Sequence, residues 1–210
     1  VDEADYEIKV TKPIVLAQAP APTLRSEFRP TKGGIQIHFT RYLCTLGFNV
    51  DHPGGRSFIT NSHCTATQGG TEGTLYYQPT NSNGQVIATE VDDPPYVKGG
   101  TCPKGKKCRS SDASRALYSG VASDRGVIAK PGSGSLTVVG EFSVTSQDDV
   151  TTHFARGTVV NKVGRTTGRT EGPVTNTCVN TNVSGSTVHL LCQTFVDAGV
   201  GSGDSGSPVF

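Results

Sequence analysis

The sequence predicts an all-β protein, built as a sandwich or a pair of barrels, and three observations lead to this prediction. Only 34% of the 210 residues are hydrophobic, while Gly, Ser, Thr and Val are plentiful. No long segment carries apolar residues at helical spacing. Short alternating runs separated by turn residues follow one another without intervening helices, which is typical of sandwiches and barrels.

The first part of the chain, residues 1–32, differs from the rest. "VDEADYEIKV" is acidic, and "LAQAPAPTLRSEFRPTK" is rich in Ala and Pro. We therefore expect an extended arm or the remnant of a prosegment here. The strand pattern begins at "GGIQIHFT", where Ile35, Ile37 and Phe39 alternate with polar residues, and it continues through "YLCTLGFNV" and "RSFITNSHC".

Two hairpins stand out further along the chain. Asn83-Gly84 lies between two alternating runs, which is the strongest short-range hairpin signal. More strands are expected in "GSLTVVGEFSV", "FARGTVVNKVG" and "GPVTNTCVNTNVSGSTVHLLCQTFV". In the last of these segments Ser184-Gly185 is the expected turn, so that Cys178 and Cys192 would lie roughly opposite each other across the two strands.

The six cysteines favour a disulfide-bonded, exported protein. They fall into pairs that are close in sequence, although the sequence alone leaves their connectivity open: Cys44 and Cys64, Cys102 and Cys108, Cys178 and Cys192. The chain starts at Val1 and contains no Met, so we expect a processed, secreted protein with three disulfides. The alternative is a reduced protein with buried thiols.

Charge and composition argue against several other classes. A net charge of +1 gives no electrostatic reason to expect nucleic acid or an anionic membrane as partner. No apolar run approaches the length that crosses a bilayer. The five His residues are scattered and no Cys-x-x-Cys occurs, so neither a metal nor another cofactor is expected.

The chain ends in "GVGSGDSGSPVF", which places Ser205 between Gly203 and Gly206. Glycines permit a tight turn that presents the serine hydroxyl and directs the N–H groups of Gly203 and Ser205 to one point. Serine catalysis also needs an imidazole that takes the hydroxyl proton and a carboxylate that orients the imidazole. Taken alone the motif is equally typical of an ordinary turn, and His63 in "SFITNSHC" favours catalysis.

These two motifs resemble the signatures of the chymotrypsin-like serine proteases, Thr-Ala-Ala-His-Cys and Gly-Asp-Ser-Gly-Gly-Pro. "GGIQI", "CTLGFNV", "FITNSHC" and "KVGRTTGRTEGPV" are similar to the bacterial secreted branch, the streptogrisin and α-lytic protease group. The resemblance runs from about Gly33 to Phe210. It implies two packed antiparallel six-stranded β-barrels: residues 33–120 with His63 and Asp112, and residues 121–210 with Ser205.

The same resemblance implies a secreted serine endopeptidase that acts on proteins or peptides through an acyl-enzyme. Ser205 would be the nucleophile and His63 the general base, with Cys64 bonded to Cys44 behind it. The N–H groups of Gly203 and Ser205 would form the oxyanion hole. The competing hypothesis is a non-catalytic, protease-like binding or adhesion module.

The orienting acid is expected to be Asp112, in "CRSSDASRALYS". Family members place this Asp late in the first barrel, before a small residue and an apolar strand. Asp92 and Asp93 are the alternative, but "VDDPPY" is more typical of a turn that proline ends. Asp112 would accept a hydrogen bond from one imidazole nitrogen and so hold the tautomer whose other nitrogen faces Ser205.

Asp204 is expected to form a buried ion pair that shapes the oxyanion turn. In the bacterial branch an internal basic residue supplies the cation, and Lys162 is the first candidate, with Arg165 second. An unpaired Asp204 in this position would be destabilising, because a buried charge needs a partner.

Four departures from the family pattern are visible. Asn161 and Glu171 stand where the branch often has a disulfide, for which Cys178–Cys192 is a candidate substitute. Ser207 replaces the second Gly of the motif, and Gly199 stands where trypsin-like members carry an acid, which disfavours a preference for Lys and Arg. The family also continues past the Ser205 motif, so we expect the second barrel to be incomplete in this chain, its strands supplied by a longer sequence or by a second polypeptide.

Overall fold

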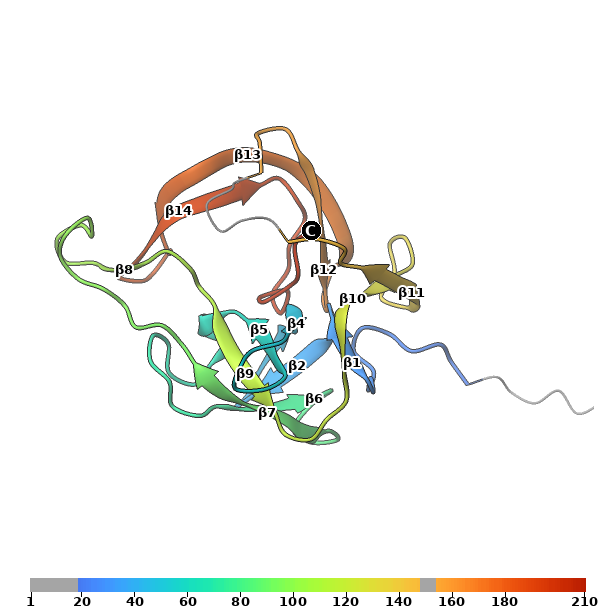
Figure 1. The fold of residues 1–210 in the computed structure, drawn as a ribbon. Coiled ribbons are helices and arrows are strands. Elements are labelled where there is room, and N and C mark those ends of the chain that lie inside the picture. Colours follow the sequence, from blue (N-terminus) through green and yellow to red (C-terminus); the bar gives the residue numbers. More distant parts are fainter. Residues whose placement is uncertain (1–18, 148–153) are drawn as a thin grey trace, which may run out of the picture.

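The computed structural model describes residues 19–147 and 154–210, and these residues are almost entirely β (Figure 1). Residues 1–18, the larger part of the expected arm, lie outside the described residues. One short 3-10 helix, η1 (Ser62–Cys64), interrupts the strands. The strands are β1 (Thr31–Gly33), β2 (Gln36–Phe39), β3 (Tyr42–Thr45), β4 (Phe48–Val50), β5 (Ser57–Thr60), β6 (Leu75–Gln78), β7 (Gln85–Asp92), β8 (Lys107–Arg109), β9 (Ser114–Tyr118), β10 (Ser123–Pro131), β11 (Val138–Ser143), β12 (Val159–Gly164), β13 (Gly168–Asn182) and β14 (Val188–Val196).

The first half of the chain forms a curled seven-stranded sheet in the order β3-β2-β6-β7-β9-β5-β4, the lower lobe of Figure 1. This sheet has seven strands rather than the expected six, because one strand is interrupted and is counted as β3 and β4. At Leu46–Gly47 the backbone changes partners: the Leu46 N–H donates to Ile35, whereas the Gly47 N–H donates to Ile59. Counted as one bent strand, β3 and β4 restore the expected number.

The remaining strands, most of them from the second half of the chain, form two smaller sheets with strand orders β12-β13-β14-β8 and β1-β10-β11. In Figure 1 the long strands β13 and β14 arch over the lower lobe. β8 comes from the range expected for the first barrel, yet it pairs in parallel with β14, with Arg109 opposite Leu190. This pairing matters for the site, because it fixes the segment that precedes Asp112.

The chain end lies between the two lobes and continues the four-stranded sheet along β12 (Figure 1). The Asn161 N–H donates to the Phe210 carbonyl at 2.6 Å, and the Phe210 N–H donates to the Asn161 carbonyl at 2.9 Å. An isolated bridge between Val209 and Lys162 therefore ties the segment that follows Ser205 to β12.

The part of the expected arm that the structure describes is packed against the rest of the molecule. Leu24 is fully buried in the main core, and its N–H donates to the Leu136 carbonyl. Thr31–Gly33 forms β1 and pairs with β10. An apolar Leu followed by a strand segment thus makes residues 24–33 part of the folded structure.

Both predicted hairpins are confirmed. β6 and β7 pair antiparallel around Asn83-Gly84, and β13 and β14 pair around Ser184-Gly185. The main core lies inside the seven-stranded sheet, where Ile37, Phe58 and Tyr76 are buried. Within residues 19–147 and 154–210, no helix is both long and apolar enough to cross a lipid bilayer.

Candidate active site

His63 and Asp112 meet at one end of the β5–β9 pair of the seven-stranded sheet. His63 lies in η1, which follows β5, and Asp112 lies just before β9, the strand that pairs with β5. His63 Nδ1 is 2.5 Å from Asp112 Oδ2, and the His63 backbone N–H donates to Asp112 Oδ1 at 3.1 Å. The His63 side chain is 41% exposed.

The carboxylate of Asp112 is kept ionised by its partners. Burial alone would raise the pKa of Asp112, but the hydrogen bond from His63 and the nearby charges of His63 and Arg109 together lower it below the usual range. An ionised carboxylate on Nδ1 favours the imidazole tautomer that accepts a proton at Nε2.

Ser205 lies on a turn that only glycines permit at two positions. Gly203 has φ +97° and Gly206 has φ +85°. A Cβ added to Gly206 would lie 2.3 Å from the Thr45 carbonyl oxygen, so no side chain fits there. Ser207, the departure from the usual second Gly, stabilises the turn because its hydroxyl donates to the Asp204 carbonyl at 2.5 Å.

The turn that carries Ser205 is bonded to Thr45, at the end of β3. The Thr45 N–H donates to the Ser205 carbonyl at 2.8 Å, and Thr45 Oγ1 donates to the Gly203 carbonyl at 2.9 Å. Thr45 follows Cys44, whose disulfide partner Cys64 follows His63. Among the described residues no hydrogen bond joins Ser205 Oγ to His63, a contact that in apo enzymes often tightens only when substrate binds.

The N–H groups of Gly203 and Ser205 have no acceptor within residues 19–147 and 154–210. Partly buried backbone donors are seldom left unpaired, because the lost hydrogen bond costs free energy. Two such donors on either side of Asp204 suit an incoming oxyanion.

Asp204 is placed with Lys162, the first of the two candidates. The side chains are 3% and 6% exposed, and Lys162 Nζ is 2.8 Å from Asp204 Oδ2. Thr167 Oγ1 and the N–H groups of Thr166 and Gly201 also donate to the carboxylate. Arg165, the second candidate, instead donates to Gln36 Oε1.

The pKa of Asp204 is lowered despite burial, which by itself would raise it. The hydrogen bonds from Lys162 and Thr167, followed by those from the backbone of Thr166 and Gly201, outweigh the desolvation. Asp204 is thus an ionised group in the interior, and it connects the nucleophile turn to β12.

Asn61 joins both sides of the site, although neither sequence motif predicts a role for it. Its Oδ1 accepts the Gly206 N–H at 2.5 Å, and its Nδ2 donates to the Asp112 carbonyl at 2.6 Å. The signal was present in the sequence, since Asn61 replaces the first Ala of Thr-Ala-Ala-His-Cys. An amide can donate and accept at once, which Ala cannot.

The sequence motifs also predict no role for Arg109, which contacts the Asp112 carboxylate. Its guanidinium donates to Asp112 Oδ1 and to Ser62 Oγ, each at 2.5 Å. Asp93, part of the alternative for the orienting acid, faces this group and accepts from Ser62 Oγ rather than from His63. No local signal marks Arg109, because an Arg in a polar, Lys-rich loop is usually solvated.

The three disulfides join the cysteines that are close in sequence: Cys44–Cys64, Cys102–Cys108 and Cys178–Cys192. Asn161 and Glu171, where the bacterial branch often has a disulfide, are direct partners across β12 and β13. Arg169 bridges them, since it donates to Asn161 Oδ1 and to Glu171 Oε2, both at 2.8 Å. A polar bridge therefore occupies the place of the missing disulfide.

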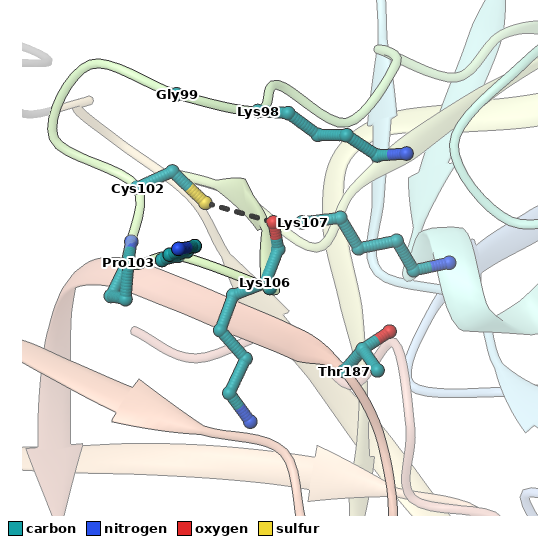
Figure 2. A pocket seen from close by; sticks show the side chains of 9 residues that line it. Lys98, Gly99, Cys102, Pro103, Lys106, Lys107 and Thr187 are labelled. Atoms are coloured by element: carbon teal, nitrogen blue, oxygen red, sulfur yellow. Dashed lines mark hydrogen bonds between the residues drawn. The ribbon is translucent and has the colours of Figure 1, made fainter.

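A cavity of about 560 Å³ lies beside the Cys102–Cys108 loop, away from Ser205. Figure 2 shows the Lys98, Lys106 and Lys107 side chains around it, with Cys102 Sγ directed at the Lys106 carbonyl. The three ammonium groups extend outward rather than converge on one point. The loop is relevant to the site because Arg109 directly follows it.

Comparison with known proteins adds to this geometry. No protein-family model matches the chain. The chain is 32% identical over 154 residues to glutamyl endopeptidase 2 of Streptomyces griseus, which is 67% of this chain and 73% of that protein. This identity and coverage are sufficient to establish the family.

Solved structures share the fold at lower identity. Thermobifida fusca protease A superposes with a TM-score of 0.59 at 22% identity, covering 85% of this chain and 76% of that chain. A glutamic-acid-specific serine protease, described as using a histidine triad in substrate binding, gives a TM-score of 0.59 at 23% identity, covering 86% and 79%.

The comparisons support protein or peptide substrates and give no support to a second polypeptide that supplies further strands. The chain has a chymotrypsin-like fold and three disulfides, and it is similar in sequence to a bacterial glutamyl endopeptidase. The chain therefore belongs to the bacterial chymotrypsin-like serine proteases and is a serine endopeptidase.

Proposed function

We propose that this endopeptidase hydrolyses peptide bonds with Ser205 as nucleophile, His63 as general base and Asp112 as orienting acid. The observation that carries the proposal is the contact of His63 Nδ1 with Asp112 Oδ2 at 2.5 Å, beside a glycine-bounded turn that holds Ser205. A carboxylate on one imidazole nitrogen leaves the other free to take a proton.

The reaction proceeds in two halves. Ser205 Oγ attacks the peptide carbonyl carbon while its proton moves to His63 Nε2, and the N–H groups of Gly203 and Ser205 stabilise the oxyanion. The C–N bond then breaks and the amine leaves with the proton from His63. A water molecule attacks the acyl-enzyme, gives a proton to His63, and releases the acid as the proton returns to Ser205.

Secretion is part of the proposal. Three disulfides within one chain of this size favour an oxidising compartment. Recovery of the mature protein from the culture medium, with all three disulfides intact by peptide mapping, is the expected result. Recovery only from the reducing cell interior would contradict this part.

For the residue before the cleaved bond, we propose an acidic or uncharged side chain rather than Lys or Arg. Gly199 offers no carboxylate where trypsin-like enzymes carry one, and the relative from S. griseus is a glutamyl endopeptidase. A panel of peptides that differ only at this residue (Glu, Ala, Phe and Lys) should show the lowest kcat/KM for Lys.

The decisive experiment is labelling with a fluorophosphonate probe, which reacts with an activated serine. The unaltered protein should be labelled at Ser205, and Ser205→Ala should lose labelling and lower kcat on the order of a millionfold. Ser202→Ala is the matched control, because Ser202 is an exposed serine of the same segment. A folded protein that takes no label and cleaves no peptide would favour a non-catalytic binding module.

A further inference from the structure

A buried guanidinium lies directly behind the carboxylate that orients His63. Arg109 is the last residue of β8, and its side chain is 6% exposed. Nη2 donates to Asp112 Oδ1 and Nη1 donates to Ser62 Oγ, both at 2.5 Å. Through Nη1, Arg109 therefore contacts Ser62, the residue that immediately precedes His63 in η1.

The surroundings of Arg109 hold the guanidinium plane in place. Its Cζ lies 4.5 Å from the centroid of the Tyr96 ring, a cation–π distance. β8 is paired with β14, and the Cys102–Cys108 disulfide closes the preceding loop. A planar guanidinium whose two terminal nitrogens are hydrogen-bonded and whose face is covered by an aromatic ring has little rotational freedom.

The charges around Arg109 come from several elements. Asp93, which follows β7 and is fully buried, lies 3.8 Å from Nη1. Lys107 lies over the Tyr96 ring at 4.1 Å. On β14 the nearest titratable group in register is His189, which is opposite Cys108 and bonded to Asn182. If the guanidinium only neutralised Asp93, its shortest contact would be with Asp93. Instead the contact with Asp112, at 2.5 Å, is shorter than the contact with Asp93, at 3.8 Å.

We propose that Arg109 is a positioning residue of the active site: it fixes the Asp112 carboxylate and Ser62 together, and so sets the orientation of His63. This inference rests on the proposed triad. Asp112 Oδ1 is occupied by Arg109 and the His63 N–H, which leaves Oδ2 for His63 Nδ1. Without Arg109 the carboxylate can rotate and the His63 ring loses its fixed direction.

Kinetics of Arg109→Gln and Arg109→Lys test the proposal. We expect both to lower kcat roughly tenfold to a hundredfold with KM changed less than about threefold, the size typical of losing a group that orients a functional side chain. Arg109→Lys keeps the charge but loses the planar fork, so a loss of kcat in this variant reports on positioning rather than on charge.

Lys107→Gln is the matched control, since Lys107 lies on the same strand and over the same Tyr96 ring but is not bonded to Asp112. It should leave kcat and KM unchanged. If Arg109→Gln fails to fold, Arg109→Lys and Tyr96→Leu provide the test. Tyr96→Leu removes the ring that covers the guanidinium but keeps Arg109 itself, so it should also lower kcat. Unchanged kcat in folded Arg109→Lys would overturn the proposal.

The unaltered protein and Ser205→Ala separate this failure from failure of the proposed function. An unaltered protein that is neither labelled nor active contradicts the triad itself. An active, labelled unaltered protein together with fully active Arg109 variants contradicts only the role of Arg109.

Discussion

At the scale of single residues, Asp204 shows how a buried charge can stabilise a turn. Its side chain is 3% exposed, and desolvation would oppose ionisation. Lys162, Thr167 and nearby backbone N–H groups compensate for the lost water. The pair is useful because breaking it leaves an uncompensated charge beneath the nucleophile turn.

Lys162→Met should therefore lower the free energy of unfolding by about 3 to 5 kcal/mol at pH 7. Because the native pKa of Asp204 is lowered, its stabilising contribution is present above the unfolded value of about 3.9 and is lost as pH falls through the native value. In Lys162→Met the penalty should shrink below about pH 4, where Asp204 can protonate. Denaturant unfolding at pH 7 and at pH 3.5 measures both effects.

Two further variants decide the interpretation. Lys104→Met, in an exposed loop, should leave stability unchanged at both pH values. Lys162→Met combined with Asp204→Asn should recover part of the loss, because it removes the charge that lacks a partner. A double variant as unstable as Lys162→Met at pH 7 would show that packing, not charge, is responsible.

At the scale of elements, the short helix η1 and the nucleophile turn are connected by one side-chain amide. Asn61 precedes η1, accepts the Gly206 N–H and donates to the Asp112 carbonyl. It thus links the segments that hold the three proposed catalytic residues. The pairing of β5 with β9 already joins the segments of His63 and Asp112, so the link that Asn61 adds is the one to the Ser205 segment.

Asn61→Ala should lower kcat roughly tenfold, and it should reduce the free energy of unfolding by about 1 to 2 kcal/mol because the partly buried Gly206 N–H loses its acceptor. The fluorophosphonate labelling rate should fall in parallel with kcat. Asn176→Ala, at an exposed position of β13, is the control for removal of an asparagine. Full activity in Asn61→Ala would contradict a role for Asn61 in positioning the turn.

At the scale of the whole molecule, the seven-stranded sheet and the segment around Ser205 meet across Thr45. Thr45 is fully buried and donates to the carbonyls of Ser205 and Gly203, while its hydroxyl accepts the Arg165 N–H at 3.1 Å. Gln36 adds a bond to the Arg165 side chain. The proposed triad depends on these bonds, because its members come from both halves of the chain.

Thr45→Val keeps the shape of the side chain but removes its hydroxyl. The Gly203 carbonyl and the Arg165 N–H then lose their partner, which should cost about 2 kcal/mol of unfolding free energy and slow labelling of Ser205. Thr175→Val, whose hydroxyl bonds only within the β13–β14 hairpin, should leave labelling unchanged. Equal labelling rates in both variants would contradict a role for Thr45 in aligning the two halves.

The sequence by itself determined the fold class, the hairpins and the family, since alternation, turn residues and glycine spacing are local properties of the chain. It also pointed to Ser205 and His63, because a nucleophile turn needs glycines in fixed positions. Only the tertiary structure decided that Lys162 rather than Arg165 contacts Asp204, that Asp93 faces Arg109, and that Arg109 and Asn61 belong to the site. Except for Arg109 and Asp112, which are three residues apart, those contacts join residues that are distant in the chain, and their partners depend on how strands pair, which no local pattern specifies.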